Sequence, residues 1–206
     1  MKKILLLIVI LSLLSLGVAC ADSIRPVTLV DGDKGRSCLD AYTGALNTIN
    51  YEHHEIHAGS GFFHTGSATL AANASTSYVI QTPDTTKWAH LTFAATGSAI
   101  TTVDIYESVD LTGTGAKQTI YNSDRNSSAT SGLEIWDAIA PGTVGGTLIW
   151  TRSSGGATQQ SRVGMSAEHN AEIILKQNTR YMIRITSGTN DNLTNLHMVW
   201  YEHQNR

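Results

Sequence analysis

The sequence predicts a mainly β protein, an antiparallel β-sandwich that is jelly-roll-like and follows an extended N-terminal arm. Three observations support this prediction. Short segments of alternating apolar and polar residues recur about every 8–15 residues, separated by residues typical of turns. No window longer than ten residues has a clean helical period. Ser, Thr and Gly are abundant, as in sandwiches with long polar loops.

The alternating segments predict nine strands, at Tyr51–His57, Thr76–Gln81, Trp88–Ala94, Ile100–Ser108, Leu133–Ile139, Thr147–Arg152, Glu172–Leu175, Tyr181–Ser187 and Leu196–His203. The turn residues of Thr96–Ala99 lie between the third and fourth segments and predict a hairpin there. The polar stretches Asn122–Ser131 and Arg152–Met165 predict exposed loops.

The two ends of the predicted domain share a short motif. Tyr51-Glu52-His53 begins the domain, and Tyr201-Glu202-His203 lies in its last predicted strand. The structural interpretation is that the first and last strands pair and present similar faces, although chance also explains so short a match.

Residues 1–21 are predicted to be a signal peptide. Two lysines precede the apolar run Ile4–Leu16, which is too short to span a bilayer and fits a signal sequence. Ala19-Cys20-Ala21 predicts cleavage before Asp22. Lipoprotein processing at Cys20 is the alternative, and it would acylate that residue and tether the chain to a membrane.

Residues 22–50 are predicted to form the N-terminal arm, and residues 51–206 the β-sandwich domain. The arm segment is too polar to form a core by itself, and its Asp-Gly and Lys-Gly pairs indicate turns. It holds Cys38, which has no internal partner once Cys20 is removed. We therefore expect a small buried thiol, with an intermolecular disulfide as the alternative.

The composition restricts the possible functions. The net charge is −3 at pH 7, and loss of the two signal-peptide lysines would make it −5. That balance excludes a nucleic-acid binder that depends on a strongly basic surface. Charged residues make up only 15% of the chain, which argues against a coiled coil or a charge-rich disordered protein.

A histidine-rich segment is the sharpest candidate for chemistry. On a strand, Tyr51, His53, Glu55 and His57 would share one face, and His53, Glu55 and His57 are candidate metal ligands. Ligands on one straight strand seldom close a coordination sphere alone, however. We therefore favour the interpretation that Tyr51, His53, Glu55 and His57 lie at a subunit interface.

The known motifs of catalysis are absent from the sequence. It has no G-x-S-x-G nucleophile elbow, no P-loop and no G-x-G-x-x-G. We therefore expect a protein that is not an enzyme and that uses no cofactor. A metal-dependent jelly-roll enzyme is a weaker alternative.

The tryptophans allow a second kind of function. Trp88, Trp136, Trp150 and Trp200 could form a platform on which sugars stack, although core packing is the default for aromatic residues in alternating strands. An exported carbohydrate-binding or adhesive module on a bacterial surface is therefore the alternative function.

Several segments together resemble poorly characterised structural proteins of tailed-bacteriophage virions, of the capsid-decoration or head-fibre kind. They are Gly44–Ile49, Tyr51–Gly59, Thr85–Phe93, Tyr121–Asn126, Gly146–Trp150, Glu172–Tyr181, Arg184–Gly188 and Trp200–His203. The resemblance covers the chain from about Gly44 to its C-terminus. No single one of these motifs encodes chemistry, and the set is specific only as a group.

The resemblance implies a virion surface protein with a β-sandwich domain and no catalytic residues. It implies capsid or other virion proteins as partners, and further copies of the chain in an oligomer. The signal peptide departs from this family, because such proteins are made in the cytoplasm. Secretion or display at the cell surface is therefore the alternative to a location on the virion.

Overall fold

The computed structural model describes residues 51–110, 115–137, 145–155 and 165–204, with the backbone alone for Tyr51 and residues 165–171. The predicted signal peptide, the predicted arm and both cysteines lie outside the described residues.

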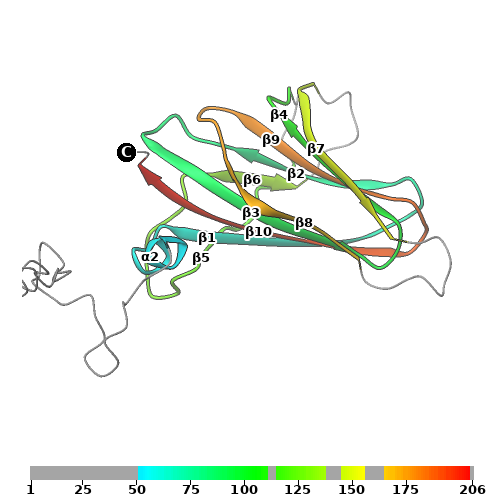
Figure 1. Ribbon diagram of the computed structural model, residues 1–206, viewed down its shortest axis with the longest axis horizontal. Helices are drawn as coiled ribbons and strands as arrows, with labels where there is room; N and C mark the ends of the chain where they lie inside the picture. Colours follow the sequence, from blue (N-terminus) through cyan, green and yellow to red (C-terminus); the bar gives the residue numbers. More distant parts are fainter. Residues whose placement is uncertain (1–50, 111–114, 138–144, 156–164, 205–206) are drawn as a thin grey trace, which may run out of the picture. The chain divides into compact units, whose positions relative to one another are not determined.

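One short helix and two layers of strands make up the described part of the chain (Figure 1). The helix, α2, spans Tyr51–His57. The strands are β1 (Gly61–Leu70), β2 (Ser75–Gln81), β3 (Lys87–Gly97), β4 (Thr101–Glu107), β5 (Tyr121–Asn122), β6 (Glu134–Asp137), β7 (Thr147–Ser154), β8 (Met165–Ile174), β9 (Arg180–Ser187) and β10 (Asn192–Gln204).

The strand order is that of a jelly roll. One sheet has the order β5-β1-β10-β3-β8 and the other β6-β2-β9-β4-β7, and the pairings are antiparallel. Leaving out the short strands β5 and β6, consecutive strands alternate between the two sheets from β1 to β4 and again from β7 to β10. This interleaving defines two Greek keys wound together. The predicted antiparallel, jelly-roll-like sandwich is confirmed.

The predicted pairing of the first and last strands is also present, but with a different first strand. β1 pairs with β10 from Gly61 opposite Tyr201 to Leu70 opposite Asn192. The sequence pattern predicts no strand at β1, and the first strand that it does predict, Tyr51–His57, is the helix α2.

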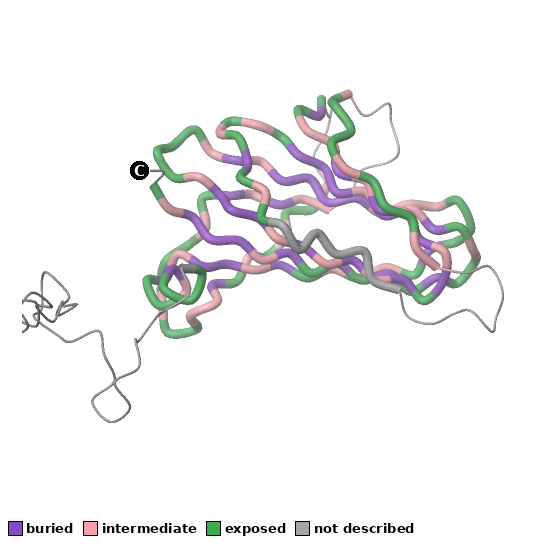
Figure 2. Tube along the Cα trace, viewed as in Figure 1, coloured by how far each residue is buried: buried purple, intermediate pink, exposed green. Residues whose placement is uncertain are grey.

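The core lies between the sheets and follows the strand alternation (Figure 2). Every second residue of β4 is buried, at Thr101, Val103 and Ile105, and Trp200 of β10 is 1% exposed. Burial of each large apolar side chain contributes about 1.5–3 kcal/mol. Since these residues come from both sheets, the apolar alternation read from the sequence also fixes which face of each strand turns inward.

The predicted hairpin between Trp88–Ala94 and Ile100–Ser108 is wrong. β3 and β4 lie in different sheets, so the turn after Gly97 crosses the sandwich instead of joining paired strands. A turn sequence shows only that the chain reverses direction. The strands before and after this turn, β3 and β4, each have one buried face, so the sequence pattern fits strands of the same sheet or of opposite sheets. The turn at Lys176–Asn178 likewise connects β8 to β9 in the opposite sheet.

The predicted loops are partly replaced by strands. β7 continues to Ser154 and β8 begins at Met165, so both ends of the predicted loop Arg152–Met165 are strand. The other predicted loop begins with the two-residue strand β5, which adds to the edge of the first sheet through Phe62 and Phe63. Polar residues tolerate these edge positions because one side of the strand faces solvent.

We call the end of the sandwich at which α2 lies the arm end, because the predicted arm directly precedes α2 in the sequence. It contains the starts of β1, β3, β7 and β9 and the ends of β2, β4, β8 and β10. The registers define it: Gly61 lies opposite Tyr201, Trp88 opposite His203, and Thr147 opposite Glu107.

Candidate functional site

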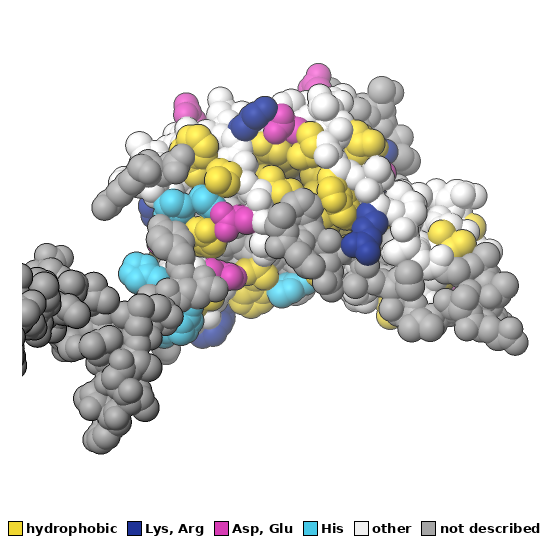
Figure 3. All heavy atoms as spheres, viewed as in Figure 1, with side chains coloured by type: hydrophobic (Ala, Val, Ile, Leu, Met, Phe, Trp, Pro, Cys, Tyr) yellow, Lys and Arg dark blue, Asp and Glu magenta, His cyan; other side chains and the backbone are white. Residues whose placement is uncertain are grey.

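Four polar side chains gather on the outer face of the first sheet at the arm end. His90 of β3 lies opposite Tyr201 of β10 in register, and His203 follows two residues later on the same face. Glu172 of β8 lies two residues before Ile174, the partner of His90. Strand alternation therefore projects all four from one face. We call His90, Glu172, Tyr201 and His203 the histidine cluster. Figure 3 shows histidine and acidic side chains close together on the face in view.

Glu172 holds the cluster together through both of its carboxylate oxygens. Oε1 accepts a hydrogen bond from His90 Nδ1, and Oε2 accepts one from the Tyr201 hydroxyl at 2.7 Å. The His90 ring also stacks on the Tyr201 ring, with centroids 4.7 Å apart. His90 is 7% exposed, so its ring is fixed on the sheet surface by packing as well as by hydrogen bonds.

The charge on Glu172 is stabilised in this arrangement. Partial burial alone would raise the pKa of its carboxyl, but the hydrogen bonds from His90 and Tyr201 outweigh that effect and lower the pKa. Glu172 is therefore an ionised acceptor at neutral pH, and it fixes the proton of His90 on Nδ1.

The two histidines of the cluster face each other through their Nε2 atoms, which lie 2.7 Å apart. His203 Nδ1 lies 2.8 Å from the backbone carbonyl of Gln204, which can only accept a hydrogen bond. A proton on His203 Nδ1 satisfies this carbonyl, as a proton on His90 Nδ1 satisfies Glu172. The sequence alone does not reveal this site. Its residues come from three separate segments, and His90 and His203 are 113 positions apart, so only strand pairing brings them together.

The predicted metal ligands do not lie on a strand. His53, Glu55 and His57 belong to α2, where residues four apart are neighbours. His53 and His57 consequently meet, with Nε2 atoms 3.1 Å apart. Glu55 is 7% exposed and lies apart from that pair, near His54. The common strand face predicted for these residues and Tyr51 is wrong, and their roles as ligands or interface remain predictions.

Features of the local sequence favour the helix α2. Residues 51–57 contain one β-branched residue, Ile56, and are followed by Gly59, which has φ +74°. Ala58 N donates to His54 O at 2.9 Å, and Ser60 N to Glu55 O at 2.9 Å, which closes the last turn. A glycine just past the segment is a helix stop signal, and it could have favoured a helix over a strand.

Glu202, between Tyr201 and His203, has a structural position. It is 6% exposed, and its carboxylate accepts hydrogen bonds from the Gly132 amide, the Ser131 hydroxyl and Trp200 Nε1. The buried side chain of Glu202 thereby joins the segment before β6 to the end of β10.

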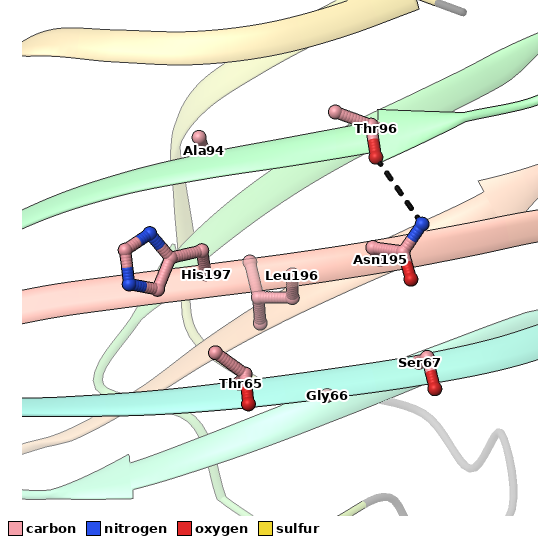
Figure 4. A pocket seen from close by; sticks show the side chains of 8 residues that line it. All are labelled: Thr65, Gly66, Ser67, Ala94, Thr96, Asn195, Leu196 and His197. Atoms are coloured by element: carbon pink, nitrogen blue, oxygen red, sulfur yellow. Dashed lines mark hydrogen bonds between the residues drawn. The ribbon is translucent and has the colours of Figure 1, made fainter.

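A shallow hollow crosses the outer face of the same sheet beyond the cluster (Figure 4). Its volume is ≈ 390 Å³, and its outward side chains are short and polar: Thr65, Ser67, Thr96, Asn195 and His197. Asn195 Nδ2 donates to Thr96 Oγ1 at 3.4 Å.

An aromatic pair lies beside the hollow. Phe63 packs on Tyr121, which is 43% exposed, and Phe63 also meets the ring of His197. Arg125 lies over the Tyr121 ring at 5.3 Å. The hollow therefore combines hydroxyl and amide groups with an exposed aromatic ring.

None of the four tryptophans is fully exposed in the described part of the chain. Trp200 is buried, whereas Trp88, Trp136 and Trp150 are half-buried. Trp150 packs edge-on against the core residue Phe93, and Trp136 packs against a small second cluster with Val79 and Met182.

Two further features are absent from the described residues. No group of three or more His, Cys, Asp or Glu side chains could hold a metal ion there. None of the helices described is both long and apolar enough to cross a membrane.

Comparisons with protein-family models, with curated proteins and with solved structures found no match to this chain.

Proposed function

We propose that this chain is a non-enzymatic structural protein of a virion surface, a decoration or head-fibre protein. In this proposal residues 22–50 attach the protein to a particle lattice, and the jelly roll is displayed from it. Its partners are capsid or other virion proteins and further copies of the chain. The mechanism is passive, through burial of apolar surface and backbone pairing.

One observation carries the proposal: exposed apolar side chains concentrate at the end where the arm joins the domain. Of the five large hydrophobic side chains that are exposed among the described residues, four lie in this half of the sandwich: Tyr121, Leu148, Ile149 and Ile174. The fifth, Leu193, lies at the opposite end. Exposed apolar side chains gathered in one region are typical of a surface that meets another protein.

The segments that resemble virion proteins give further support. Within the described residues all but one of them reach the arm end, the exception being Arg184–Gly188. They include the three strand segments that supply the histidine cluster. A binding end would gather motifs in this way, whereas motifs needed only for folding would be distributed over the core.

Deletion of residues 22–50 tests the proposal. We expect the deleted protein to lose association with particles in a density gradient, while its thermal unfolding midpoint stays unchanged, because the core residues come from the strands. Leu148→Ser with Ile149→Ser should weaken association, and Leu193→Ser is the matched control. The attachment model fails if the deleted protein decorates particles as well as the full chain does.

Glycan binding is a second candidate function, favoured by the hollow and its aromatic neighbour. Hydroxyl and amide groups beside an exposed ring are the groups that sugars use, through hydrogen bonds and stacking. On a glycan array we expect a signal that Tyr121→Ala abolishes and that Leu193→Ala leaves unchanged. A blank array with the folded protein would reject this candidate.

A further inference from the structure

We propose that His90 and His203 bind a divalent transition-metal ion of the zinc class between their Nε2 atoms. This inference is independent of the proposed function, because it concerns the isolated protein. It rests on the distance between the two Nε2 atoms and on the groups that orient the two rings.

Both rings present lone pairs toward the same point. The carboxylate of Glu172 and the carbonyl of Gln204 are hydrogen-bond acceptors beside the Nδ1 atoms of His90 and His203. A proton on each Nδ1 leaves a lone pair on each Nε2, and the two Nε2 atoms lie 2.7 Å apart. In that tautomer a cation between the two Nε2 atoms would remove the repulsion of their lone pairs.

The oxygen partners favour the metal ion. Histidines that bind metals almost always donate their second ring N–H to a carboxylate or a backbone carbonyl, which fixes the ring and increases its basicity. His90 has the carboxylate and His203 has the carbonyl. The negative charge of Glu172 also favours a nearby cation, and Tyr201 orients that carboxylate from the other side.

The distance requires a small adjustment. With Zn–N bonds of about 2.0–2.1 Å, two histidine nitrogens lie about 2.9 Å apart at a right angle and about 3.4 Å apart in a tetrahedron. The observed 2.7 Å therefore has to open by a few tenths of an ångström. His203 lies near the end of β10 and is half-buried, so it can move more easily than His90.

The site supplies two protein ligands in the described part of the chain and leaves other positions open. No third His, Cys, Asp or Glu completes the set among those residues. Water or a donor from another protein would take these positions, as in open metal sites. The exposed pair His53 and His57 of α2 has Nε2 atoms 3.1 Å apart and provides an internal comparison.

Titration calorimetry of the purified protein with zinc chloride tests the proposal. We expect one zinc ion per chain. His203→Gln and Glu172→Gln should each weaken the affinity by about tenfold or more. The double variant His53→Gln with His57→Gln is the matched control and should keep the affinity. Circular dichroism melting checks that each variant is folded.

Nitrogen NMR of the histidine side chains gives a second readout that does not depend on the variants. We expect zinc to shift Nε2 of both His90 and His203 and to leave their protonated Nδ1 atoms in place. The proposal is overturned if the folded protein binds no zinc at millimolar concentration, if one ring is doubly protonated and zinc shifts neither, or if binding disappears in the α2 double variant instead.

Discussion

At the scale of single residues, Asn192 is a fully buried polar group whose hydrogen bonds join separate segments of the chain. It is 0% exposed and lies at the end of the sandwich opposite the arm end. Its Oδ1 accepts the Ala99 amide at 2.9 Å, and its Nδ2 lies within 3.0 Å of the Ile100 carbonyl and the Ser187 hydroxyl. The side-chain amide of Asn192 thus provides hydrogen-bond partners for the backbone between β3 and β4 and joins that segment to the end of β9.

We expect Asn192→Ala to lower the free energy of unfolding by about 2–4 kcal/mol, because it leaves buried backbone groups without partners. Urea denaturation measures the change. Asn195→Ala is the matched control on the same strand, since Asn195 is exposed, and it should cost less than about 0.5 kcal/mol. Equal losses in the two variants would contradict the role of the buried amide.

At the scale of elements, Glu107 joins β4 to the turn between β8 and β9. Its carboxylate accepts hydrogen bonds from Lys176 Nζ at 2.6 Å and from the Tyr181 hydroxyl at 3.0 Å. The hydrogen bond from Lys176 is the main cause that lowers the pKa of Glu107, against the opposing effect of burial. Burial, followed by the Glu107 contact, raises the pKa of Tyr181 to about 12.

These shifts give a pH dependence of stability. Because the pKa of Glu107 is lower in the folded chain, its contribution is present above the unfolded pKa and is lost as pH falls through the folded value. We expect Glu107→Gln to lose less stability than the parent protein between pH 5 and pH 3 in urea titrations. If the unfolding free energies of the two proteins fall in parallel with pH, the hydrogen bonds of Glu107 do not contribute to stability.

Tyr181 gives the opposite pH dependence of stability, at alkaline pH. A raised pKa contributes stability that is present below the unfolded value of about 10 and is lost as pH rises toward 12. Tyr181→Phe should remove this alkaline loss, in the same titrations.

The helix α2 shows why one element was predicted wrongly. Its residues are almost all polar, and Tyr51 and Ile56 are five positions apart, so a strand here would have no apolar face to bury. Local closure by Gly59 and the hydrogen bonds of Ala58 and Ser60 decided the conformation. The change of element also changed the metal prediction, since a helix brings His53 to His57 and removes Glu55 from the pair.

At the scale of the whole molecule, the jelly roll explains how distant segments form one end. Each sheet takes strands from both halves of the chain, so the last strand β10 lies between β1 and β3. As a result α2, the histidine cluster and four of the five exposed large hydrophobic side chains of the described residues occur in the same half. The deletion of residues 22–50 tests this arrangement as an attachment end, and the zinc titration tests it as a binding site.

The sequence by itself determined the class of fold, because alternation with period two fixes which side chains of a strand can be buried. The strands β2, β3, β4, β9 and β10 follow directly from such patterns. It did not determine which strands pair, because a turn sequence fits either a hairpin or a crossover between sheets. The histidine cluster depends on that choice. Glu172, His90 and His203 meet only because antiparallel register places β8, β3 and β10 side by side, and that register is a property of the tertiary structure.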